Sequence, residues 1–189
     1  MMRAVTAAAL LLVCRCGGDA PANPIRVAVP ADDDSPPEAV IIMRRLDGAR
    51  LGRHSQPPGP GHPRPITLTE PRLRATTVGR DPNGGVARVR VSISERIDCR
   101  HAGGGTEEVL RTRYFPPPQI ETIRSNPGAP LPTAATRTVP LSLVGDRCGG
   151  AEATAVHGEL WGEAINGAGL EAVTPHLRFS WRKPTFGGD

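Results

Sequence analysis

The stretch from Arg72 to Ile97 constrains the fold more than any other part of the chain. Its first arm, 72–80, begins with an alternation of arginine or threonine and apolar residues, and its second arm, 86–94, alternates valine, alanine and isoleucine with arginine and serine. A period of two places one set of side chains on a core and the other in water. Between the arms, Asp81-Pro82-Asn83-Gly84-Gly85 has the composition of a turn. The stretch therefore predicts two antiparallel strands joined as a hairpin.

Further runs of residues are typical of strands, and no segment has a helical period of useful length. These runs are 39–43, 106–114, 138–144, 155–164 and 177–181. Pro140 predicts an edge position for its run, because proline cannot donate a ladder hydrogen bond. The last two runs, with the turn residues Asn166-Gly167-Ala168-Gly169 after the first of them, predict a second hairpin. Gly 22 and Pro 21 in 189 residues favour long loops over a helical bundle. The fold class expected is all-β.

The N-terminal residues 1–24 have the pattern of an export signal. Arg3 supplies a positive charge, and residues 4–13 form an uncharged apolar run that suits a signal peptide. Cys14 directly follows this run and resembles the lipidated cysteine of a bacterial lipoprotein signal, with Cys16 as the alternative site. Ordinary cleavage near Ala20-Pro21-Ala22 is the other possibility. The expected address is the cell envelope, either membrane-anchored through lipid or secreted.

The domain organisation follows from composition. Residues 25–37 are rich in proline and aspartate and predict a disordered linker, 38–184 carry the strand patterns of one domain, and 185–189 form a short tail.

Two segments carry a resemblance to a known family. Leu73–Ile93, with its Asp-x-Asn-Gly-Gly turn, resembles the B and C strands of bacterial immunoglobulin-like or fibronectin type III-like domains. Ala164-Ile-Asn-Gly-Ala-Gly-Leu is similar to their F–G hairpin. The resemblance spans roughly Pro37 to Lys183 and implies an antiparallel β-sandwich of about seven strands. The chain departs from antibody domains, because no cysteine lies on the B or F segment and no tryptophan on the C segment.

Cys99 and Cys148 remain once the signal-region cysteines are set aside. In the topology that the resemblance implies, Cys99 follows strand C and Cys148 follows strand E, so both lie at the same end of the sandwich. An exported protein meets oxidising conditions, and we therefore expect a disulfide between them. The alternatives are two free thiols or a catalytic Cys99 beside His101.

The sequence carries no motif of enzyme, metal or cofactor chemistry. The carboxylates considered for catalysis, Glu107, Glu108, Glu159 and Glu163, have no telling spacing. Lys183 is the only lysine, and the arginines are interleaved with acidic residues along the chain. With 3% aromatic residues there is little to stack on bases, so nucleic-acid binding is not expected.

One aromatic residue is a candidate for a binding surface. Trp161 lies on the strand face opposite Leu160, where an exposed tryptophan marks a site for a sugar or a protein partner, while a tryptophan covered by a loop is the alternative. We expect a non-catalytic, monomeric binding or spacer module at the cell envelope. Its partner would be an envelope protein or glycan, and its only membrane contact the N-terminal lipid. A carbohydrate-binding module is the alternative function.

Overall fold

The computed structural model describes residues 25–30, 32–55, 65–116, 129–144 and 148–184. These residues form twelve β-strands and no helix, so the expected all-β class is confirmed. Residues 1–24, where an export signal with Cys14 or Cys16 is expected, and residues 185–189, expected as a tail, lie outside the described residues.

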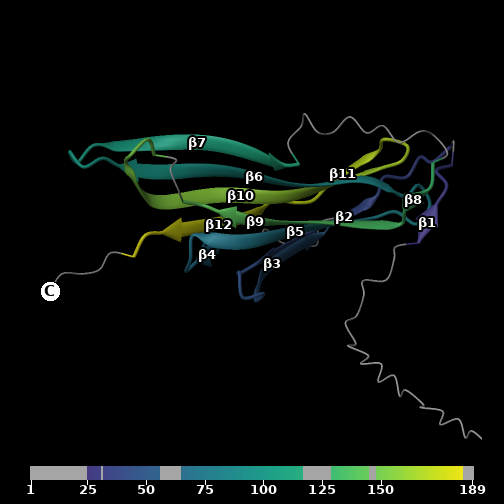
Figure 1. Cartoon of the computed structure of the whole chain (residues 1–189), viewed down its shortest axis with the longest axis horizontal. Helices are drawn as coiled ribbons and strands as arrows, with labels where there is room; N and C mark the ends of the chain where they lie inside the picture. Colours follow the sequence, from purple (N-terminus) through teal and green to yellow (C-terminus); the bar gives the residue numbers. More distant parts are fainter. Residues whose placement is uncertain (1–24, 31, 56–64, 117–128, 145–147, 185–189) are drawn as a thin grey trace, which may run out of the picture.

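Two antiparallel sheets stack as the two layers of the molecule (Figure 1). The six-stranded sheet has the order β4-β12-β10-β6-β7, with β11 paired to β10, and β4 is its one parallel neighbour. Its strands are β4 (Ile66–Leu68), β6 (Val86–Arg100), β7 (Thr106–Phe115), β10 (Glu152–Asn166), β11 (Glu171–Val173) and β12 (Leu177–Arg182). The four-stranded sheet has the order β3-β2-β5-β9. Its strands are β2 (Glu38–Arg44), β3 (Arg50–Ser55), β5 (Arg72–Arg80) and β9 (Ala134–Ser142).

The core lies between these sheets because the inner residues of each strand are apolar at every second position. Ile41, Met43 and Leu73 of the four-stranded sheet are fully buried, as are Ile93 and Leu160 of the six-stranded sheet. The sheets lie close together where Gly162 of β10 faces Thr77 of β5. A Cβ atom added to Gly162 would lie 2.6 Å from both Oγ1 and Cγ2 of Thr77, so only glycine leaves enough space there.

The two arms of the 72–97 stretch are strands, but they do not pair with each other, and the predicted hairpin is wrong. β5 pairs with β2 and β9, whereas β6 pairs with β10 and β7. The turn between them carries the chain from one sheet to the other. In this turn the Asp81 carboxylate accepts backbone hydrogen bonds from Asn83 at 3.0 Å and Gly84 at 2.7 Å. Alternation cannot distinguish the two arrangements, because apolar faces can lie side by side in one sheet or face each other across a core.

The other strand predictions agree more closely with the structure. β10 and β12 pair antiparallel as the second predicted hairpin requires, and β11 lies between them in sequence. β9 is an edge strand, as Pro140 predicted. The proline-rich stretch 52–65 favours an exposed loop, yet residues 52–55 belong to β3 and pair with β2.

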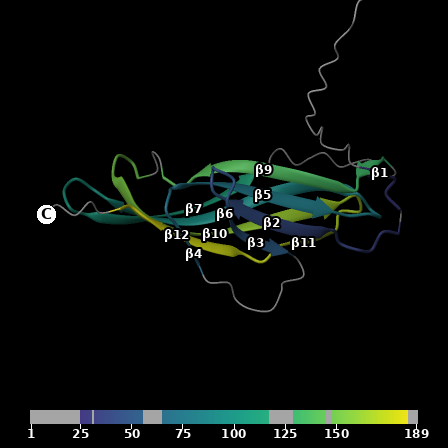
Figure 2. The same cartoon turned by 90° about the horizontal axis from the view of Figure 1, so that it is seen from below.

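The segment expected to be a disordered linker contacts the domain. β1 (Arg26–Val27) pairs with β8 (Leu131–Pro132) at the end of the molecule that holds the β5–β6 turn (Figure 2). Further along the segment, the Asn166 side chain donates hydrogen bonds to the Asp33 carboxylate at 2.8 Å and the Ser35 carbonyl at 2.9 Å. Residues on both sides of position 31 are therefore held against the sandwich.

Candidate functional site

A disulfide joins Cys99 and Cys148, as predicted, with a Cα–Cα distance of 5.7 Å. Cys99 lies near the end of β6, and Cys148 lies in the connection between β9 and β10, so the bridge fastens this connection to the six-stranded sheet. Both residues are buried. The pairing removes Cys99 as a candidate nucleophile, because its sulfur is bonded and inaccessible.

The outer face of the six-stranded sheet carries an open hollow of about 550 Å³. It is formed where side chains of β6, β7, β10 and β12 share the same cross-strand rows. The hollow is lined on this face by the side chains of Ser94, Arg96, Leu110, His157, Glu159, Arg178 and Ser180, together with Pro65. Leu110 is 74% exposed, an unusual value for a leucine in a strand, and adds apolar surface to a largely polar wall.

Trp161 lies next to the hollow in an aromatic cluster on the same face. Its ring stacks on His176 at a centroid distance of 4.6 Å and an interplanar angle of 14°. The ring of Tyr114, from β7, meets Trp161 edge-on at 6.5 Å. The guanidinium of Arg90 lies 5.5 Å from the centroid of Tyr114. Trp161 is half-buried, and described neighbours on the sheet hold it in place.

Glu163 fixes the indole of Trp161 from below. Its Oε1 atom accepts hydrogen bonds from Trp161 Nε1 and Ser92 Oγ, each at 2.8 Å. Its Oε2 atom pairs with Arg90 Nη1 at 2.7 Å. These contacts engage both oxygens of a buried carboxylate, so Glu163 orients the aromatic cluster.

Glu159 connects the aromatic cluster with the hollow. It contacts His176 Nδ1 at 2.8 Å and accepts a bond from Arg178 Nε at 3.1 Å. The hydrogen bond with His176 lowers the pKa of Glu159, and the charges of His176 and Arg178 act in the same direction against a weaker effect of burial. The two Glu159 oxygens are thus directed at two donor groups, Oε2 at His176 and Oε1 at Arg178.

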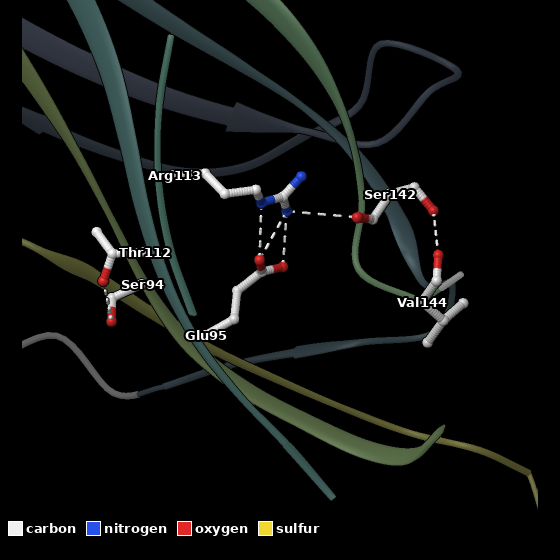
Figure 3. Close-up of polar contacts among 6 residues, drawn as sticks. All are labelled: Ser94, Glu95, Thr112, Arg113, Ser142 and Val144. Atoms are coloured by element: carbon white, nitrogen blue, oxygen red, sulfur yellow. Dashed lines mark hydrogen bonds and ion pairs between the residues drawn. The ribbon is translucent and has the colours of Figure 1, made fainter. Parts of the chain in front are cut away.

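A second ion pair lies on the inner side of the same sheet (Figure 3). Glu95 faces the core, and its carboxylate accepts hydrogen bonds from Arg113 Nε at 2.9 Å and Arg113 Nη2 at 2.8 Å. The same Nη2 reaches the backbone carbonyl of Ser142, on β9 of the other sheet, at 3.4 Å. On the outer side, Thr112 Oγ1 contacts Ser94 Oγ at 3.5 Å. The inner pair therefore links the two sheets.

The structure brings together some of the candidates from the sequence and separates others. Glu159 and Glu163 flank Trp161 on one face, whereas Glu107 and Glu108 lie at the far end of β7, paired with His101 and Arg96. Sequence reasoning missed Tyr114 and His176 as neighbours of Trp161. Alternation along β7 indicates the face of Tyr114, whereas His176 precedes β12 outside any strand, and only the strand order puts both beside Trp161.

Metal and membrane signatures were also sought in the described part of the chain. No group of three or more histidine, cysteine, aspartate or glutamate side chains is arranged there to hold a metal ion. No helix within the described ranges has the length and apolarity to cross a bilayer.

Comparison with known proteins gives little to add to this geometry. No protein-family model matches the chain. No curated protein matches it. Among solved structures it is similar to the protein assigned as ApaA from Bordetella pertussis, at 10% sequence identity over 79% of this chain and 97% of that chain, with a TM-score of 0.24. Neither a fold assignment nor a function is taken from a similarity at that level.

Proposed function

We propose that this protein is a non-catalytic binding module of the bacterial cell envelope, exported and built on an immunoglobulin-like β-sandwich. The observation that carries the proposal is the hollow on the outer face of the six-stranded sheet. Polar side chains from three strands, β6, β10 and β12, converge there, and Leu110 of β7 adds an exposed apolar wall. A concave surface with a few oriented polar groups is the usual form of a ligand site.

The immunoglobulin-like assignment is supported by the path of the chain between sheets. β5 and β6 lie in different sheets, as the B and C strands do in the family that the sequence resembles. The parallel pairing of β4 with β12 and the additional short strands are departures from that pattern.

The absence of catalysis is supported by the state of the carboxylates on and under the face. Glu163 and Glu95 are buried and engaged by hydrogen bonds and arginines, and Glu159 is engaged by His176 and Arg178. A pair of carboxylates serving as acid and base needs one member with a raised pKa, and the pKa of Glu159 is lowered. Turnover assays on ester, peptide and glycoside substrates are expected to show no activity above buffer.

Export is supported by the Cys99–Cys148 disulfide, because structural disulfides persist mainly in oxidising compartments. Lipid attachment at Cys14, with Cys16 as the alternative, is the proposed tether. Fractionation of host cells with and without inhibition of lipoprotein processing tests this. A mature form in the membrane fraction that shifts to a larger precursor supports the tether. A soluble extracellular form would support export and overturn the lipid anchor. Recovery of the intact chain from the cytosol would overturn both proposals.

The second candidate function is carbohydrate binding, and the aromatic cluster around Trp161 favours it. Sugar rings bind against aromatic side chains flanked by hydrogen-bonding groups, and the hollow supplies Ser94, Ser180 and His157 beside the Trp161–His176 stack.

A glycan array and a pull-down on insoluble cell-wall polysaccharide test the site directly. Ser180→Lys places a long side chain in the hollow, and Thr136→Lys makes the same kind of change on the outer face of the other sheet. We expect the wild type and T136K to be retained and S180K to lose retention, with all three folded by circular dichroism. Equal retention of S180K would place the site elsewhere. No retention of the wild type on any glycan would remove the carbohydrate candidate.

A further inference from the structure

Arginine is distributed unequally between the two sheets. The strands of the four-stranded sheet contain seven arginines and one carboxylate, Glu38. The strands of the six-stranded sheet contain eight arginines, four on β6 and two each on β7 and β12, and they also contain eight carboxylates. The fold therefore collects uncompensated positive charge on one layer, although charges of both signs alternate along the sequence.

Six of these arginines lie on the outer face of the four-stranded sheet, where Arg80 is directly opposite Glu38 and the other five lie toward the opposite end of β5. Arg44 of β2 is directly opposite Arg50 of β3 and directly opposite Arg74 of β5, so three guanidinium groups start from one cross-strand row. Arg53 and Arg72 lie beside this row on β3 and β5. We call these five residues the arginine face. Like charges placed directly opposite each other in a sheet are destabilising, so this row carries a cost in the free protein.

The arginine face lacks the acidic partners that would relieve this repulsion. Arg50, Arg53, Arg72 and Arg74 are exposed, and no ion pair links any of them to a carboxylate of the described residues. Arg44 donates to the Gly48 carbonyl at 3.0 Å, which is a neutral acceptor. By contrast, the neighbouring Arg45 in the β2–β3 turn is paired with both Asp47 and Glu70. An external anion would supply the negative charge that the described residues do not.

We propose that the arginine face binds the anionic phospholipid headgroups of a membrane surface. Guanidinium groups bind phosphate oxygens through paired hydrogen bonds and dehydrate more readily than ammonium groups. The five arginines lie on three neighbouring strands, and on β3 and β5 they also occupy two positions along the strand. They are therefore spread over an area, which matches a two-dimensional layer of phosphates better than a single linear polymer. Half-buried Val40, Ile42 and Val78 lie on the same outer face and add a low apolar surface between the charges.

This inference goes beyond the proposed function and uses the opposite side of the sandwich. The outer faces of the two sheets point away from each other (Figure 1). A domain that lies on a membrane through the arginine face would direct the hollow of the six-stranded sheet away from the lipid. The two sites can therefore be lost independently, and S180K is expected to bind vesicles like the wild type.

Vesicle sedimentation with the full chain tests the proposal. The probes are vesicles of phosphatidylcholine alone and of equal parts phosphatidylcholine and phosphatidylglycerol, so the neutral vesicles report any contribution of the N-terminal apolar segment. Each arginine near an anionic surface contributes on the order of five-fold in binding. Arg50→Gln with Arg74→Gln should lower the phosphatidylglycerol-dependent partition about 25-fold. The matched control, Arg100→Gln with Arg182→Gln, removes the same charge from exposed ends of the six-stranded sheet and should retain most of the binding.

The outcomes separate the membrane proposal from the alternatives. Equal losses in the two pairs of variants would mean attraction by net charge only and would overturn the site. Binding to soluble polyphosphate without binding to the anionic vesicles would overturn the membrane as its occupant. The thermal midpoint of the free R50Q/R74Q variant should be unchanged or higher, because a repulsion is removed. A marked decrease would show that these arginines serve the fold, which contradicts the proposal.

Discussion

Glu95 and Arg113 join the two layers of the molecule from within. The Glu95 side chain has no exposed surface and that of Arg113 is 14% exposed, and Arg113 also reaches the Ser142 carbonyl of the opposite sheet. Arg113 comes from β7, the edge strand of its sheet. A charged residue that points inward on an edge strand discourages pairing with a strand of another molecule, so this pair both connects the layers and protects an edge.

Glu95→Ala should destabilise the protein by about 3 kcal/mol, because it leaves the largely buried guanidinium of Arg113 without its carboxylate. The double variant Glu95→Leu with Arg113→Leu removes both charges, and its free energy of unfolding should lie within about 1 kcal/mol of the wild-type value. Urea denaturation of the three proteins gives the comparison. A double variant as unstable as E95A would mean that the charges themselves stabilise the native state.

Gly162→Ala should destabilise the protein by about 1–3 kcal/mol, since the new methyl group would overlap Thr77 of the opposite sheet. Thr77→Ala in the same chain removes the two atoms at 2.6 Å and should restore part of the loss. Gly103→Ala is the control, because nothing lies within 4 Å of the added Cβ atom there. Thermal unfolding would reject the close approach of the sheets if G162A and G103A behaved alike.

Replacing Cys99 and Cys148 by serine should destabilise the protein by about 2–4 kcal/mol. The bridge closes a segment with a sequence separation of 49, which corresponds to about 4 kcal/mol of chain entropy at the upper end. Unfolding of the wild type with and without reductant provides the same test without mutation. Identical midpoints in the two conditions would argue against a stabilising role for the bridge.

His176→Ala should raise the pKa of Glu159 toward that of a free glutamate, because the strongest interaction that lowers it is lost. A carboxylate whose folded-state pKa lies below its unfolded-state value stabilises the native protein above the unfolded-state pKa, and this contribution disappears as pH falls through the folded-state pKa. The wild type should therefore lose stability on acidification below the usual glutamate range more steeply than H176A. NMR titration of the Glu159 carboxyl group decides this, and equal values in both proteins would contradict it.

Local sequence patterns predicted strands well and strand partners poorly. Pro140 indicated an edge because its consequence is local, namely a missing N–H group. The β5–β6 hairpin was wrong because alternation records which side chains are apolar, and carries no information on which sheet they belong to. The disulfide was predicted through a topology that the chain resembles, and the structure brings the two cysteines to a bonding distance.

The candidate sites show the same division. Trp161 was identified because a large aromatic residue on a polar strand face is visible in the sequence. Tyr114 and His176 are separated from it along the chain. Tyr114 reaches it because β7 and β10 both pair with β6, and His176 reaches it because β12, which follows His176, pairs with β10. The arginine face could not be predicted from the sequence for a related reason. Acidic and basic residues are interleaved along the chain, and they separate only when strands distant in sequence assemble into two sheets.

The most direct test of the account is an NMR titration of the full chain with soluble cell-wall glycan fragments. The central claim is that the outer face of the six-stranded sheet holds the ligand. We predict shifts of the Trp161 indole N–H and of the backbone amides of Ser94, His157 and Ser180, with the amides of β2 and β5 unchanged. Shifts on β2 and β5 alone, or no shift with any fragment that the protein retains in a pull-down, would contradict the claim.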